Sequence, residues 1–255
     1  MGTHVNGPRK PDDETTLHMG THVDGPEGGS VESGTLPPER VQAMFDRIAP
    51  VYDVMNRVMT AGLDQRWRRA TARAVVRQGD AVLDAACGTG DLAVACACEG
   101  GRVTGLDFAE RMLERARRKA PELEWVQGDM LDLPFAEETF DAATVGFGVR
   151  NVSDLEVGLR ELHRVLRPGG RVAILEITRP RGVLRPFYSL WFDRLVPLLG
   201  KLLPGGDAYT YLPASVKRFP DVDALAELLG TVGFGDVQYR TFAGGIVALH
   251  TGTRT

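Results

Sequence analysis

Apolar residues recur along the chain from Glu39 onward with two alternating spacings. Helical spacing predicts amphipathic helices, and short apolar runs bounded by turn residues predict buried strands. Three helices are expected first, over residues 39–48, 51–58 and 63–76. Five strands are then expected over residues 81–85, 102–106, 123–127, 140–145 and 171–177, with helices over 91–99, 109–119 and 153–166 between them. The run Arg167-Pro-Gly-Gly170 predicts a turn before the fifth strand.

The last part of the chain predicts two more helices and a hairpin. The helices are expected over residues 183–203 and 221–232, and two strands over 236–242 and 246–251, joined across Gly244-Gly245. A short connection of this kind favours antiparallel pairing, whereas alternating strands and helices favour a parallel sheet covered on both faces. The sequence therefore predicts an α/β, Rossmann-like fold with a seven-stranded, mostly parallel sheet and an antiparallel strand.

Residues 1–38 have a different composition, rich in Gly, Pro, Thr, Asp and Glu. A segment with so few large apolar residues does not offset its ordering entropy, so we expect a disordered leader before one domain over residues 39–255. Met1–Pro8 recurs almost unchanged as Met19–Pro26, and translation from Met19 is the alternative. The three histidines of this segment match no known ligand spacing, so no metal site is predicted.

Composition and charge exclude several classes of protein. The chain has 255 residues with a net charge of −4 and a hydrophobic content of 43%, which suits one soluble domain with a sizeable core. An acidic chain has no basic footprint for nucleic acid. The cysteines, Cys87, Cys96 and Cys98, suit free thiols in a reducing compartment. No apolar stretch reaches the roughly 18 residues of a membrane span, so a cytoplasmic protein is expected.

The segment Val82–Ala93 turns from a predicted strand through Gly88, Thr89 and Gly90 into a helix. Glycines let backbone N–H groups approach a ligand closely. The spacing, with Asp107 following, also fits the dinucleotide fingerprint of nicotinamide enzymes. Charge decides between the two cofactors, because Asp84 and Asp91 would repel a pyrophosphate. The same acids suit the ammonium and sulfonium of S-adenosylmethionine, which is the predicted cofactor.

Asp84, Asp107 and Asp129 lie at the carboxyl ends of three successive predicted strands. Ligands of parallel sheets bind at this edge. We expect Asp107 to accept hydrogen bonds from both ribose hydroxyls and Asp129 to accept one from the adenine amine. Phe108 and Met130 are expected to pack on the adenine faces. Each acid also has a structural alternative, in which it caps a turn or a helix.

Several segments between residues 41 and 252 follow a recognisable order. They are Tyr52–Asn56 with Thr60 and Trp67, the glycine loop, Phe147–Asn151, Arg164–Glu176, Asp207–Leu212 with Phe219-Pro220, and Gly244–His250. Together they resemble class I S-adenosylmethionine methyltransferases and, more narrowly, the ubiquinone/menaquinone biosynthesis C-methyltransferases. The chain departs from this family at Thr60, where many members have Ser, and at Asp64, where many have His. Gly146 replaces a small hydroxyl residue that approaches the cofactor in relatives.

The resemblance implies methyl transfer to the ring carbon of a demethylated isoprenoid quinol, such as demethylmenaquinol, under an N-terminal helical lid. A ring carbon becomes nucleophilic when a neighbouring hydroxyl loses its proton, so the enzyme has to stabilise a phenolate. Arg150 is the predicted group for this role, with Tyr52 and Asn151 orienting the quinol. The alternatives are a surface ion pair of Arg150 with Asp154 or Glu156, and plain packing of Tyr52.

Partners and competing functions complete the prediction. The segment 183–203 mixes apolar and basic residues, which suits peripheral contact with the inner face of a membrane where the quinol resides. A second copy of the chain, in a homodimer, is the other predicted partner. Three other functions stay open at this point: a methyltransferase for a soluble aromatic or polyketide, a nicotinamide-dependent oxidoreductase, and a cofactor-binding regulatory protein without turnover.

Overall fold

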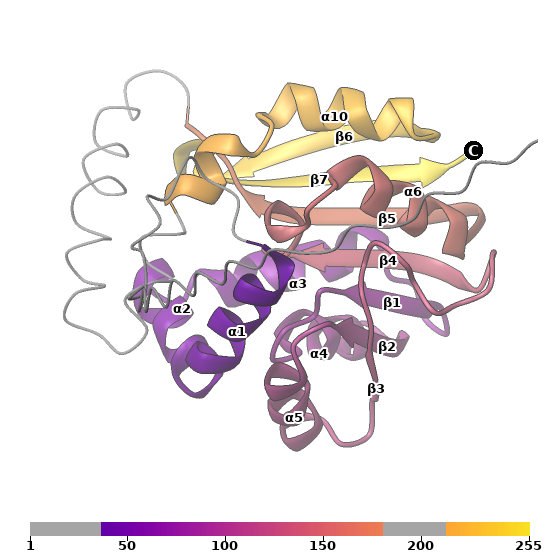
Figure 1. Ribbon diagram of the computed structural model, residues 1–255. Coiled ribbons are helices and arrows are strands. Elements are labelled where there is room, and N and C mark those ends of the chain that lie inside the picture. The colour runs from indigo at the N-terminus through magenta and orange to yellow at the C-terminus, as the bar shows by residue number, and fades with distance from the viewer. Residues whose placement is uncertain (1–36, 181–212) are drawn as a thin grey trace, which may run out of the picture. The chain divides into compact units, whose positions relative to one another are not determined.

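The computed structural model describes residues 37–180 and 213–255, which form an α/β unit around one sheet (Figure 1). Three helices come first, namely α1 (Pro38–Ile48), α2 (Tyr52–Thr60) and α3 (Asp64–Val75), with the 3-10 helix η1 (Ala49–Val51) between the first two. The strands are β1 (Ala81–Ala85), β2 (Arg102–Asp107), β3 (Glu124–Gln127), β4 (Phe140–Gly146), β5 (Leu166–Ile177), β6 (Phe234–Phe242) and β7 (Val247–Arg254). Further helices are α4 (Asp91–Cys98), α5 (Glu110–Lys119), η2 (Val149–Asn151), α6 (Leu155–Val165), α10 (Val222–Thr231) and η5 (Ala243–Gly245), and residues 213–218 are also helical. Every predicted element in this part of the chain is present.

The strands form one sheet in the order β3-β2-β1-β4-β5-β7-β6. Strand β7 is antiparallel to both β5 and β6, and the other neighbouring pairs are parallel. The predicted mostly parallel, seven-stranded sheet with an antiparallel strand is therefore confirmed. The predicted turn at residues 167–170 was placed wrongly. Leu166 already pairs with Phe140, and pairing resumes at Arg171 with Ala142, so the intervening residues bulge out of β5.

Neighbouring residues of the central strands point into two separate cores. Val82, Ala142 and Ala173 pack with residues of α3 and α4, whereas Leu83, Ala143 and Ile174 pack with residues of α6 and α10. Because side chains alternate along a strand, a sheet covered on both faces needs apolar residues at consecutive positions. This requirement explains why the central strands read as continuous apolar runs rather than as alternating ones.

The N-terminal helices lie at the end of the sheet to which β4 points (Figure 1). Helix α3 packs on β4, β5 and α4, and α1 contacts α5. Two hydrogen bonds hold α1 there: Gln42 Nε2 donates to Phe108 O at 2.8 Å, and the backbone N–H of Arg111 donates to Asp46 Oδ1 at 3.1 Å. The second bond satisfies a donor in the first turn of α5, which has no partner within its own helix. The expected N-terminal lid thus has a defined attachment beside the second strand.

The leader was predicted to extend through Pro38, but α1 already begins at that residue. The rest of the leader, the predicted helix over 183–203 and the matched segment Asp207–Leu212 lie outside the described residues. Within the described residues, no helix has the length and apolar content that crossing a membrane requires.

Candidate active site

The glycine loop follows β1 and turns sharply beside the end of β2. Gly88 and Gly90 have φ values of 56° and 84°, which glycine adopts without strain. Gly90 also has no room for a side chain, since a Cβ there would lie 2.5 Å from the Trp125 ring. The Cys87 N–H donates to Leu106 O, and the Gly88 N–H donates to Asp107 Oδ2 at 2.7 Å. The loop is therefore tied to the neighbouring strand through one of the predicted acids.

Asp107 lies where the sequence places it, on the wall of a cavity at the carboxyl ends of the strands. Its Oδ2 accepts the Gly88 N–H, and its Oδ1 accepts the Ala109 N–H at 2.9 Å. The carboxylate thus both caps the start of the next segment and faces the cavity. Burial raises its pKa to about 6, although the hydrogen bonds from Ala109 and Gly88 oppose this shift.

Asp84 lies behind the glycine loop rather than on the cavity wall. It is fully buried and accepts a hydrogen bond from Thr144 Oγ1 at 2.7 Å. Burial raises its pKa to about 7, against the opposing effects of the Thr144 hydrogen bond and the Arg68 charge. Gly90 is also absent from the cavity wall, on which Gly88 and Thr89 lie. Asp84 thus acts on this site through charge and loop geometry rather than by contact.

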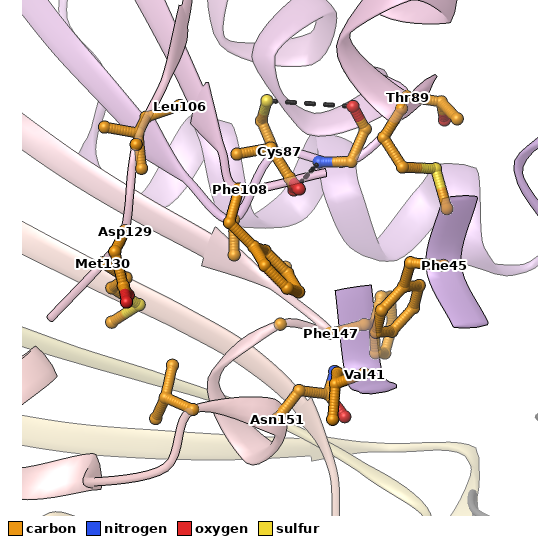
Figure 2. Close-up of a pocket in the computed structure, with 18 of the residues that line it drawn as sticks. Val41, Phe45, Cys87, Thr89, Leu106, Phe108, Asp129, Met130, Phe147 and Asn151 are labelled. Carbon is orange, nitrogen blue, oxygen red and sulfur yellow. Dashed lines mark hydrogen bonds between the residues drawn. The ribbon is translucent and has the colours of Figure 1, made fainter. Parts of the chain in front are cut away.

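Most of the predicted cofactor residues line the cavity at this edge of the sheet. They are Gly88, Thr89, Asp107, Phe108, Asp129, Met130 and Gly146. Figure 2 shows Asp129 and Met130 beside each other and Phe108 projecting between them and the helix that carries Val41 and Phe45. Met130 is buried, whereas Asp129 is exposed and accepts the Leu131 N–H at 2.9 Å. The wall combines acids, aromatic faces and exposed backbone, which fits an adenosine with a cationic tail.

A second cavity lies under the N-terminal helices. Its wall is mostly apolar and includes Met44, Ile48, Val51, Met55, Met59, Leu63 and Trp67. Four residues line both cavities: Phe45, Tyr52, Arg68 and Phe147. Because they share these walls, the two cavities are adjacent, and the cofactor cavity with its carboxylates meets the apolar cavity at Tyr52 and Arg68. Tyr52 is half-buried there, and its ring stands edge-on to Phe45.

Arg150 lines the apolar cavity but not the cofactor cavity, and Asn151 lines only the cofactor cavity. The predicted alternative, a surface pair of Arg150 with Asp154 or Glu156, is wrong. Arg150 Nη1 instead lies 2.7 Å from Glu176 Oε1, and the two side chains are 9% and 2% exposed. The same Nη1 donates to Phe147 O at 2.6 Å. Arg150 therefore anchors the turn after β4 as well as facing the cavity.

The sequence pointed to Thr89 and Asp91 of the glycine loop but not to their role in fastening the lid. Asp53 of α2 accepts a hydrogen bond from Thr89 Oγ1 at 2.5 Å and one from Lys119 Nζ at 2.9 Å. Lys119 Nζ also lies 2.5 Å from Asp91 Oδ1. Asp53, the glycine loop and Lys119 are far apart in the chain, so no pattern in the sequence indicated that they meet. Phe45, Lys119 and Arg68 follow ordinary helix patterns and were not distinguishable from surface or core positions.

The family model of the ubiE/COQ5 methyltransferase family matches residues 34–254. The chain belongs to the ubiE/COQ5 methyltransferase family. A demethylmenaquinone methyltransferase of Clavibacter sepedonicus is 43% identical over 223 residues, covering 85% of this chain and 91% of that protein. One of Thermus thermophilus is 44% identical and covers 83% and 100%. A ubiquinone/menaquinone biosynthesis C-methyltransferase of Geotalea daltonii is 39% identical and covers 85% and 97%. The resemblance drawn from the sequence motifs is confirmed.

Solved structures confirm the fold. A S-adenosylmethionine-dependent methyltransferase of Thermotoga maritima superimposes with a TM-score of 0.64 at 19% identity, covering 84% of this chain and 99% of that one. A phosphoethanolamine N-methyltransferase of Haemonchus contortus in complex with S-adenosylmethionine gives a TM-score of 0.57 at 15% identity, covering 74% and 52%. The chain has the Rossmann-like fold of class I methyltransferases. It is a methyltransferase that uses S-adenosylmethionine, and the oxidoreductase alternative is excluded.

The buried acids predict that cofactor binding depends on pH. The pKa of Asp84 is raised to about 7 and that of Asp107 to about 6 by burial, so both are largely protonated in the free protein near pH 5.5. A cationic donor favours the ionised carboxylates and lowers both pKa values, so binding releases protons. We expect affinity for S-adenosylmethionine to rise from pH 5.5 to pH 8. Calorimetry at pH 6.5 in two buffers of different ionisation enthalpy measures the protons released.

S-adenosylhomocysteine, which lacks the sulfonium charge, is the matched ligand for this experiment, and it should release fewer protons. Equal proton release by both ligands, or an affinity independent of pH, would contradict the assignment of the raised pKa values to carboxylates that sense the donor.

Proposed function

We propose that this protein transfers a methyl group from S-adenosylmethionine to a ring carbon of a demethylated isoprenoid quinol, converting 2-demethylmenaquinol to menaquinol. The observation that carries the proposal is the apolar cavity that shares a wall with the cofactor cavity. A quinol with an isoprenoid tail needs an apolar chamber of this kind, with its ring held next to the methyl donor. A soluble polar acceptor would leave this wall without a partner.

Different residues of the cofactor cavity are expected to hold different parts of the methyl donor. Asp107 is expected to accept hydrogen bonds from both ribose hydroxyls, since each of its two oxygens accepts one backbone N–H and keeps a second lone pair for a ligand. Asp129 and Met130 are expected to hold the adenine together with Phe108, and Gly88, Thr89 and Gly146 to surround the methionine part. When bound, the donor supplies a methyl group that its sulfonium already activates. The residues of this chain then need only to bind, orient and exclude water.

The chemistry of the quinol defines the steps that residues of the two cavities have to assist. Its hydroxyl proton passes to water, and the ring carbon forms a bond to the methyl carbon while the electron pair of the sulfur–methyl bond stays on sulfur. The ring carbon then loses its own proton and the oxygen regains one, so the net reaction releases a single proton. We propose that Arg150 stabilises the developing phenolate and that Tyr52 and Asn151 orient the ring.

The named relatives support the quinol over the alternative acceptor. The proteins of Clavibacter sepedonicus and Thermus thermophilus are both named demethylmenaquinone methyltransferases, and this chain covers at least 91% of each. A methyltransferase for a soluble aromatic or polyketide is therefore not favoured, and turnover is expected rather than a purely regulatory role.

The test is direct. The full chain is incubated with methyl-labelled S-adenosylmethionine and a short-tailed demethylmenaquinol kept reduced, and the product is analysed by mass spectrometry. We expect a single added methyl group on the ring carbon. Methylation on oxygen, or on a soluble naphthol but not on the prenylated quinol, would overturn the proposed acceptor.

Three finer features belong to the same proposal: peripheral membrane contact through residues 183–203, assembly as a homodimer, and a disordered leader before α1 in a cytoplasmic protein. The membrane contact draws support from the basic and apolar composition of 183–203, and the leader from its polar composition. Flotation with anionic liposomes tests the first, and loss of association on deleting 183–203 is the expected result.

A further inference from the structure

Arg68 of α3 stands at the junction of the two cavities. It lines both of them, and its side chain is 6% exposed. The sequence motifs do not include Arg68, which is one of several arginines in an arginine-rich helix. Its neighbour Arg69 points to solvent on the same helix. A buried arginine is costly unless its charge and its five N–H donors find partners.

Within the described residues, the guanidinium of Arg68 is poorly satisfied. Its one ion pair is with Asp64, at 3.8 Å between Nε and Oδ2, which is too long for a hydrogen bond. Its Nε is buried and has no hydrogen-bond acceptor. Asp64 in turn is satisfied by other groups, since Thr60 Oγ1 donates to it at 3.0 Å and Gln65 Nε2 at 3.2 Å. Arg150, by contrast, already has Glu176 as a close partner.

The surroundings hold this guanidinium in place without using its donors. It stacks over the Phe147 ring at 5.2 Å from the centroid, which is a favourable cation–π distance. Gly146 leaves it room, because a Cβ at that position would lie 3.3 Å from Nη1. The charge of Arg68 also lowers the pKa values of both Asp84 and Asp91, so it lies near the acids of the glycine loop. Arg68 is thus positioned between loop and chamber with donors unused.

We propose that Arg68 binds an anionic oxygen of a bound reactant at this junction. Two reactants have such an oxygen: the methyl donor, in its carboxylate, and the quinol, in the phenolate that forms beside the reacting carbon. The carboxylate and the phenolate would both lie at the wall common to the two cavities, where Arg68 lies. Each provides the hydrogen-bond acceptor that the guanidinium lacks. The phenolate as the bound oxygen rests on the proposed function, whereas the carboxylate depends only on the cofactor.

The experiment compares Arg68→Gln and Arg68→Lys with Arg69→Gln, an exposed arginine of the same helix, in the full chain. Calorimetry with S-adenosylhomocysteine and with 5′-methylthioadenosine, which lacks the amino acid part, tests the carboxylate. If this is the source, Arg68→Gln weakens binding of S-adenosylhomocysteine about 30-fold, leaves 5′-methylthioadenosine unchanged, and Arg68→Lys restores part of the affinity.

If the phenolate is the source, both ligands bind Arg68→Gln normally and kcat falls about 30-fold. The acid limb of the pH–rate profile then moves to higher pH, because the quinol hydroxyl is harder to ionise, and Arg68→Lys moves it back. Thermal unfolding shows whether each variant folds. Normal ligand affinities together with an unchanged kcat and pH profile in folded Arg68→Gln would overturn the proposal. Should wild-type protein methylate no quinol, the calorimetric arm still tests Arg68 separately from the proposed function.

Discussion

Replacing Arg150 by alanine is expected to lower the free energy of unfolding by about 3–5 kcal/mol, because it strands a buried carboxylate. Glu176 is 2% exposed, and Arg150 Nη1 lies 2.7 Å from its Oε1. The substitution also removes the donor to Phe147 O, which supports a residue with a φ of 62°. Urea denaturation followed by circular dichroism measures the change.

The control is the double variant Arg150→Met with Glu176→Gln, which removes both charges and keeps the side-chain volume. Replacing both members of a buried pair is often close to neutral, so this variant should unfold within about 1 kcal/mol of wild type. A loss of under 1 kcal/mol in Arg150→Ala alone would show that the pair is not buried as described. The double variant also tests catalysis cleanly: reduced turnover with normal affinity for the methyl donor supports the role of Arg150 at the phenolate.

Replacing Asp107 by alanine is expected to weaken binding of S-adenosylmethionine by about two to four orders of magnitude. Each hydrogen bond to a charged group contributes about 1.5–3 kcal/mol, and the expected contacts are with two ribose hydroxyls. The variant further deprives the Gly88 N–H of its acceptor, which loosens the glycine loop. Calorimetric titration measures the affinity.

Two comparisons distinguish the loss of the contact between Asp107 and the ribose from a general disruption of the site. Asp107→Asn keeps an acceptor and loses the charge, so its affinity should fall by only about tenfold. Binding of 5′-methylthioadenosine should fall in Asp107→Ala by the same factor as that of the full donor, since both ligands share the ribose. A loss confined to ligands with the methionine part would place Asp107 at the other end of the cofactor.

Most of the fold was accessible from the pattern of apolar residues. The strand from Ala81 to Ala85 was predicted with its bounds, and the hairpin across Gly244-Gly245 placed an antiparallel strand in the sheet. Local periodicity predicts such elements because buried strands and amphipathic helices differ in spacing. The bulge at residues 167–170 was missed, because a run of Pro and Gly residues reads as a turn whether or not a neighbouring strand pairs across it.

The candidate site divides in the same way. Strand ends are local features of the sequence, and the carboxyl ends of parallel strands meet at one edge, so Asp107, Phe108 and Asp129 were found together at the cavity. Asp84 was also predicted at the cavity, but it lies behind the loop because its side chain points to Thr144 of the neighbouring strand. Which way a strand-end side chain turns depends on its neighbours across the sheet.

The order of residues along the chain was enough to establish the class of fold, the family and the nature of the cofactor, since these depend on periodicity, on the glycine loop and on acids at strand ends. The partner of Arg150, the apolar chamber under α1 to α3 and the position of Arg68 between two cavities emerged only from the folded chain. Such features join segments distant in sequence, and the burial and distance that give them their energy exist only after packing.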